Sequence, residues 1–97
     1  MNIRLTPRAL AEAKRIKTWW LRNRPAAPHL FEEELSATLA RLRITPNAGV
    51  IYPAGPDVEV RRMLMPRTQH HIYYAIENEQ IVVLSLWSAR RGRDPRL

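Results

Sequence analysis

The run from Ile81 to Trp87 constrains the fold more than any other part of the chain, because it is apolar at nearly every position. A strand with one solvent-facing side alternates apolar and polar residues, whereas a strand covered on both sides is apolar on both of its faces. We therefore predict that residues 81–87 form a central, buried strand of a small sheet.

Three other segments have the pattern of strands. Residues 2–5 form a short candidate, and residues 58–64 and 71–76 alternate apolar side chains with polar or smaller ones. Residues 77–80 would then be the hairpin connection to the buried strand. Residues 45–56 hold three prolines and two glycines, which predicts a loop.

Two amphipathic helices are predicted between the first strand and this loop, at residues 7–22 and 29–44. Thr6 is a favourable N-cap, and Pro7 suits the first helical position because its missing N–H is not needed there. Each helix has a single apolar stripe, so both must cover a further apolar surface. The stripes are Ala9, Ala13, Ile16 and Trp20 on the first helix, and Phe31, Leu35, Leu39 and Leu42 on the second.

The order strand, helix, helix, strand, strand, strand predicts an α+β fold. A helical hairpin would cover one face of a small, mainly antiparallel sheet and leave the other face available for function. A chain of 97 residues supports one hydrophobic core, so we expect a single domain over residues 1–97.

The charge indicates the kind of partner. Sixteen Lys and Arg residues against nine Asp and Glu residues give a formal charge of +7, which favours nucleic acid or an acidic protein segment. Without cysteine the chain has no disulfide, Cys-based zinc site or thiol nucleophile. His70 and His71 would point to opposite faces of one strand, so we expect no metal site and no cofactor. The absence of a signal-like or membrane-length apolar run leads us to expect a cytoplasmic protein without membrane contact.

Four segments in this order resemble the ParE/RelE toxin superfamily. They are Leu5–Ala9, Val60–Leu64, His70–Tyr74 and Ile81–Arg91, and together they span nearly the whole chain. The resemblance implies the fold above and the toxin role in a type II toxin–antitoxin system, neutralised by an acidic antitoxin. Its nearest branch is the ParE-like, or plasmid stabilisation, toxins.

Two activities compete within that superfamily. RelE-like members are ribosome-dependent endoribonucleases that cut messenger RNA, whereas ParE-like members inhibit DNA gyrase through protein contact. The sequence departs from the nuclease pattern: His71 replaces a family arginine, Ser88 replaces a family histidine, and the C-terminus lacks a Tyr or His. RNA cleavage needs one group that accepts a proton and another that donates one, and only His71 suits this role near neutral pH. We therefore expect a ParE-like binding protein, not an enzyme.

Two alternatives stay open. In the nuclease alternative His71 is the base, and Arg61, Arg90 and Arg91 hold the scissile phosphate. In the other, the chain is a basic nucleic-acid-binding module whose affinity falls steeply with salt.

Two sets of residues are predicted to carry binding. One member, Arg61, has an alternative role in a surface ion pair with Glu59. Another, Trp19, lies off the apolar stripe of its helix, where it could be an exposed contact. The target-binding set consists of Arg61, Arg62, Arg67, Arg90, Arg91 and Arg93. The antitoxin-binding set consists of Arg8, Arg15, Trp19, Arg22, Leu30, Ala37 and Ile44.

Overall fold

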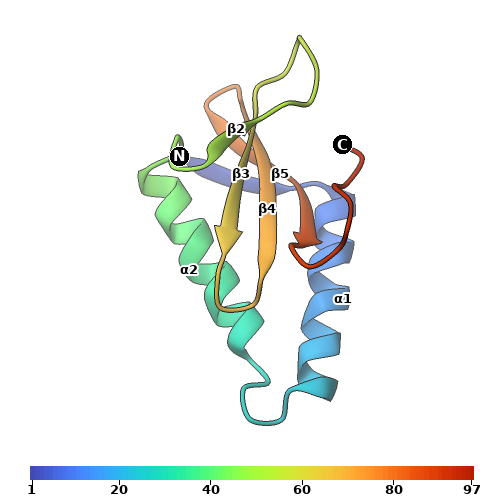
Figure 1. Cartoon of the computed structure of the whole chain (residues 1–97). Coiled ribbons are helices and arrows are strands. Elements are labelled where there is room, and N and C mark those ends of the chain that lie inside the picture. Colours follow the sequence, from blue (N-terminus) through green and yellow to red (C-terminus); the bar gives the residue numbers. More distant parts are fainter.

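The computed structural model describes residues 1–97 as two helices packed on a five-stranded sheet (Figure 1). The strand order is β1-β5-β4-β3-β2, in which β1 runs parallel to β5 and the other neighbours are antiparallel. The predicted α+β class and the helical layer are confirmed. The elements along the chain are β1 (Asn2–Leu5), α1 (Pro7–Asn23), α2 (Leu30–Ile44), β2 (Val50–Tyr52), β3 (Val60–Met65), β4 (His70–Glu77) and β5 (Gln80–Ser88).

β5 is the buried interior strand that the apolar run predicted. It lies between β1 and β4, and Ile81, Val82, Val83 and Leu86 are all buried. Its ladder with β4 contains a bulge: Tyr73 pairs with Ser85 and Tyr74 pairs with Val83, so that Leu84 is skipped. A bulge bends and twists its strand locally.

The short edge strand β2 was missing from the predicted order. Residues 45–56 were predicted to be a loop, yet Val50–Tyr52 pair with Val60–Arg62 of β3. The β-branched and aromatic side chains of these three residues favour an extended backbone. Three residues are too few to show a period of two, and the surrounding prolines and glycines dominated the pattern.

The two helices begin and end close to their predicted bounds. The hydroxyl of Thr6 accepts a 3.1 Å hydrogen bond from the Ala9 amide, and Pro7 is the first helical residue. The helices meet at the 24–29 connection and diverge from there, with α1 beside β5 and α2 toward β3 (Figure 1).

The core lies between the helices and one face of the sheet. Both predicted helical stripes contribute to it, with Ala9, Trp20, Phe31 and Leu42 buried and the remaining stripe residues partly buried. The sheet adds Met63, Met65, Ile72, Tyr74, Ile81, Val83 and Leu86.

The second face of the sheet differs from the prediction that it would be left open. After β5 the chain turns back, and its C-terminal end runs to the start of α1 (Figure 1). The indole Nε1 of Trp87 donates a 3.0 Å hydrogen bond to the Arg93 carbonyl, and Pro95 is buried. The sequence in this segment has no periodicity, so its position could not be predicted.

A cationic pocket between α1 and the sheet

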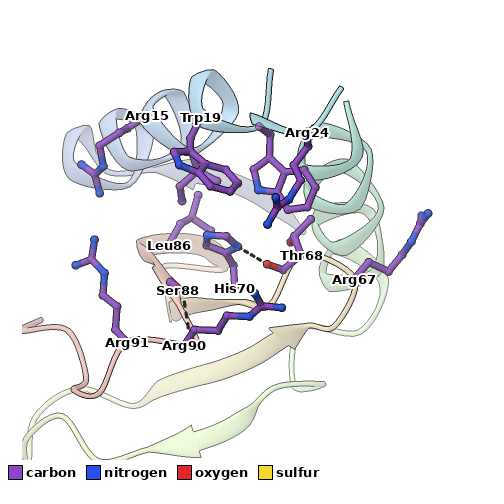
Figure 2. A pocket seen from close by; sticks show the side chains of 12 residues that line it. Arg15, Trp19, Arg24, Arg67, Thr68, His70, Leu86, Ser88, Arg90 and Arg91 are labelled. Atoms are coloured by element: carbon purple, nitrogen blue, oxygen red, sulfur yellow. Dashed lines mark hydrogen bonds between the residues drawn. The ribbon is translucent and has the colours of Figure 1, made fainter. Parts of the chain in front are cut away.

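A pocket of about 640 Å³ lies on the helix side of the sheet, between α1, the β3–β4 turn and the end of β5 (Figure 2). Its lining combines arginines with an apolar and aromatic floor. The arginines are Arg15, Arg24, Arg67, Arg90 and Arg91, the apolar residues are Ile16, Trp19, Trp20 and Leu86, and the other polar residues are Thr68, His70 and Ser88.

Helical spacing explains the contribution of α1. Arg15 and Trp19 lie four residues apart, as do Ile16 and Trp20, so all four side chains fall on neighbouring rows of the helix. Ile16 and Trp20 reach the core, whereas Trp19 stays 46% exposed at the rim. The guanidinium of Arg24 lies 4.9 Å from the ring centre of Trp19 and 5.6 Å from that of Trp20, which are cation–π distances.

The lining of the pocket carries positive charge and no negative charge. No aspartate or glutamate lines it, and none of its five arginines takes part in the ion pairs of the structure. Like charges that converge without counter-charge raise the local positive potential and attract anions. The arrangement therefore favours an anionic ligand that also has an apolar part for the tryptophans.

Two buried glutamates hold the walls in place. The Glu34 carboxylate of α2 accepts hydrogen bonds from the Arg67 amide (2.7 Å), the Thr68 amide (2.9 Å) and the Thr68 hydroxyl (2.6 Å). The β3–β4 turn is thereby fixed to α2, because hydrogen bonds to a carboxylate are the stronger kind.

The buried carboxylate of Glu12 holds α1 against β5 in a similar way. Its Oε1 atom accepts from the Ser85 hydroxyl at 3.0 Å and from the Leu86 amide at 3.2 Å, next to the bulge. Arg8 lies 3.6 Å from the other carboxylate oxygen. Both carboxylates are buried and neither lines the pocket, although the charge of Glu34 still acts on His70.

His70 lies at the centre of the pocket as a neutral ring. Burial lowers its pKa most, and Arg91 and Arg90 act in the same direction, whereas the hydrogen bond to Thr68 and the charge of Glu34 act against them. Its Nδ1 lies 3.0 Å from the Thr68 carbonyl, which only accepts, so Nδ1 bears the hydrogen and Nε2 is left as an acceptor. His70 thus adds polarity but no charge near pH 7.

The target-binding set is divided among the pocket, the C-terminal segment and both faces of the sheet. Arg67, Arg90 and Arg91 line the pocket, and Arg93 lies on the C-terminal segment. Arg62 points to the opposite face of the sheet. Arg61 lies on the helix side, where its Nη1 donates to the Asn47 and Gly49 carbonyls and its Nη2 lies 3.4 Å from Glu59.

The antitoxin-binding set is divided as well. Arg15 and Trp19 line the pocket, while Arg22 is exposed near the end of α1 and Arg8 meets Glu12 and the Arg96 carbonyl.

The three α2 residues of the antitoxin-binding set, Leu30, Ala37 and Ile44, do not form a continuous exposed row. Leu30 packs against the core, whereas Ile44 is 85% exposed at the other end of the helix. At 1.5 Å per residue these two residues lie about 21 Å apart along the axis. Ala37 is exposed between them, and none of the three lines the pocket.

Four charged or polar lining residues were missed by the sequence reasoning, which also placed the lining residues Ile16, Trp20 and Leu86 only in the core or the buried strand. Arg24 follows the predicted end of the helix, and Thr68, His70 and Ser88 are ordinary strand or turn residues without a motif. The alternation along β4 assigns His70 and His71 to opposite faces, but it does not say which of the two faces the helices.

The four residues of the nuclease alternative do not converge. His71 lies on the face away from the helices, 6.0 Å from the Tyr73 ring, and burial lowers its pKa. Arg61 lies on the opposite face, and Arg90 and Arg91 lie at the end of β5. In the pocket itself, His70 has no carboxylate partner for proton transfer.

No group of three His, Cys, Asp or Glu side chains is placed to hold a metal ion. None of the helices combines the length and apolar character that crossing a membrane requires.

Comparison with known proteins identifies the class to which this two-layer α+β domain with its cationic pocket belongs. The family model described as "ParE toxin of type II toxin-antitoxin system, parDE" matches residues 3–93. The chain therefore belongs to the ParE toxin family of type II toxin–antitoxin systems. No curated protein matches the sequence.

Two solved structures share the fold at low sequence identity. A chain of the chromosomal ParDE toxin–antitoxin system from P. aeruginosa is 16% identical, with a TM-score of 0.72 over 93% of this chain and 97% of that one. The isolated E. coli RelE toxin is 17% identical, with a TM-score of 0.60 over 95% of this chain and 87% of that one.

Proposed function

We propose that this toxin acts by stoichiometric binding to a protein target, with DNA gyrase as the target, and that an acidic antitoxin neutralises it. The observation that carries the proposal is the convergence of unpaired arginines on one pocket with an aromatic floor. Such a pocket can bind anionic and aromatic groups, whereas it offers no second group for proton transfer.

The pocket also suggests how neutralisation works. Arg15 and Trp19 were predicted to contact the antitoxin, and Arg67, Arg90 and Arg91 were predicted to contact the target, yet these five residues surround one cavity. An acidic antitoxin segment in this cavity would exclude the target directly. Neutralisation would then be competitive and would not require a change in the fold of the toxin.

An acidic, partly disordered segment suits this pocket physically. Opposite charge accelerates the encounter, and an apolar side chain against Trp19 and Trp20 slows dissociation. The P. aeruginosa ParDE structure, by its description, comes from a toxin–antitoxin system, which supports a paired antitoxin for this chain.

A growth assay with matched variants tests the role of the pocket. The double variant R90Q/R91Q should lose growth arrest on expression, whereas R41Q/R43Q, which removes the same charge near the end of α2, should keep it. Equal toxicity of the two variants, at equal levels of folded protein, would refute the pocket as the functional site.

Gyrase is tested separately. The purified chain should inhibit supercoiling by gyrase, and R90Q/R91Q should inhibit it much less. Unchanged supercoiling at a large excess of the toxin would rule out this target.

The nuclease alternative predicts a different result. Primer extension on translated messages would show cuts with codon periodicity, and H71A would abolish them. That outcome would replace binding by catalysis as the mechanism of the toxin.

A further inference from the structure

The C-terminal segment, residues 93–97, is seated on the face of the sheet away from the helices and the cationic pocket. The Arg93 carbonyl accepts from the Trp87 indole, and Asp94 Oδ1 lies 3.9 Å from Arg62 Nη1. Pro95 is buried, and the Arg96 carbonyl accepts from the Arg8 guanidinium. The segment thus spans from β3 to the start of α1 without being a helix or a strand itself.

The surface beside it is aromatic and cationic. The rings of Tyr52 and Tyr73 meet edge to face at 5.0 Å, and His71 lies 6.0 Å from Tyr73. The guanidinium of Arg62 lies 5.3 Å from the Tyr52 ring centre. Burial raises the pKa of the Tyr52 phenol, and the neighbouring Asp94 carboxylate acts in the same direction.

Two polar side chains on this face, Tyr73 and Arg62, lack well-placed hydrogen-bond or ion-pair partners. The Tyr73 hydroxyl is fully buried and has no hydrogen-bond partner. A buried donor without an acceptor costs free energy. Arg62 has only one carboxylate nearby, at the 4 Å limit of an ion pair, and Asp94 is 65% exposed. A segment held by so few contacts opens more easily than the core.

We propose that this face is a second protein-binding surface, which the C-terminal segment occupies in the free toxin and from which an extended acidic segment of a partner displaces it. The seated segment itself indicates the chemistry of the occupant: a carboxylate beside Arg62, a buried proline-sized apolar group, and a backbone carbonyl for Trp87. A partner with several carboxylates would pair Arg62 more closely and supply an acceptor for Tyr73.

The chain has its own site-specific reporters for a test. Trp87 lies on this face, whereas Trp19 and Trp20 lie in the cationic pocket. Because the guanidinium of the pocket residue Arg91 lies 4.0 Å from the Trp87 ring centre, a ligand in the pocket can also shift the Trp87 resonance of ¹⁵N-labelled full-length toxin, so the two sites are separated by comparing variants of each. The probe is an acetylated and amidated peptide of the sequence Glu-Asp-Pro-Glu-Leu.

Substitutions that weaken the contacts of the C-terminal segment should strengthen peptide binding at this face alone. In D94N, the Kd read from the Trp87 resonance should fall about threefold to fivefold, as expected for the loss of a partly exposed ion pair that stabilises the closed state. P95G should lower it as well, and R62Q should raise it at least tenfold. D57N, a matched change in the β2–β3 loop, should leave it unchanged.

Equal Kd values at Trp87 for wild type, D94N and P95G would overturn the proposal. A Trp87 resonance that responds to the oligonucleotide dT₆ but not to the peptide would overturn it too. The Trp19 and Trp20 resonances and the R90Q/R91Q variant test the cationic pocket instead, so failure at one site is distinguishable from failure at the other.

Discussion

The hydroxyl of Thr68 donates a 2.6 Å hydrogen bond to the buried carboxylate of Glu34, which also accepts two backbone amides of the same turn. This contact joins α2 to the β3–β4 turn over a sequence separation of 34 residues. It places Arg67 and Thr68 at the wall of the cationic pocket.

E34Q should lower the free energy of unfolding by about 2 kcal/mol, because the amide keeps the shape but loses charge-assisted hydrogen bonds. Urea unfolding measures the change. E33Q, at the exposed neighbouring position, serves as the control and should stay within about 0.5 kcal/mol of the wild type. Equal stabilities of the two variants would show that the Glu34 contacts do not hold the turn.

E12Q should be destabilising by about 1–2 kcal/mol, because one buried carboxylate oxygen accepts from both Ser85 and Leu86. The loss should appear mainly in β5, so hydrogen exchange of the Leu86 amide is the informative measurement. The exposed Glu77 provides the matched control. An unchanged exchange rate in E12Q would contradict the proposed clamp between α1 and β5.

Two neighbouring tyrosines should respond in opposite ways to loss of the hydroxyl. Tyr74 accepts from the Gly49 amide at 2.9 Å and donates to the Pro46 carbonyl at 2.8 Å, so Y74F should cost about 1–2 kcal/mol. The Tyr73 hydroxyl is buried without a partner, so Y73F should be neutral or slightly stabilising. Thermal or urea unfolding checks both; a larger loss for Y73F than for Y74F would be inconsistent with this structure.

Stability should fall as the pH decreases from about 7.5 to 5.5. Burial lowers the pKa values of His70 and His71 in the folded state below the ordinary value of about 6.5, so the unfolded chain binds more protons in this range. The free energy of unfolding therefore rises with pH up to about 6.5 and is reduced below it.

Urea unfolding at pH 7.5 and 5.5 measures this dependence. H70Q should show a smaller difference between the two pH values than the wild type. An identical difference in H70Q would assign the effect to other groups. The lowered pKa of Glu32 acts in a lower pH range, since its ordinary value is already near 4.5.

The periodic parts of the fold were predictable from the sequence. The helical stripes and the doubly apolar run of β5 each bury a row of side chains, and burial of this kind leaves a repeat in the sequence. The sequences of β2 and of residues 93–97 have no such repeat, because each segment is held in place by a few long-range contacts. Only the fold brings Asp94 near Arg62 or Trp87 near Arg93.

The site was predictable in its chemistry and not in its grouping. Local charge identified Arg15, Arg67, Arg90 and Arg91, but the sequence assigned Arg15 to one surface and the other three to another. The pocket joins them because α1 crosses the end of β5, a relationship between segments more than sixty residues apart. His70 was missed because a strand alternation gives two faces without saying which one the helices cover.

The parallel pairing of β1 with β5 also bears on how this toxin is made. Residues 2–5 pair with residues 80–83, so the first strand cannot join the sheet until the last strand has been synthesised. Contacts between distant segments form late, because the whole intervening loop must be ordered first. A nascent chain that has not emerged through Arg91 lacks a wall of the pocket, so the growing polypeptide cannot present the complete pocket until synthesis is almost finished.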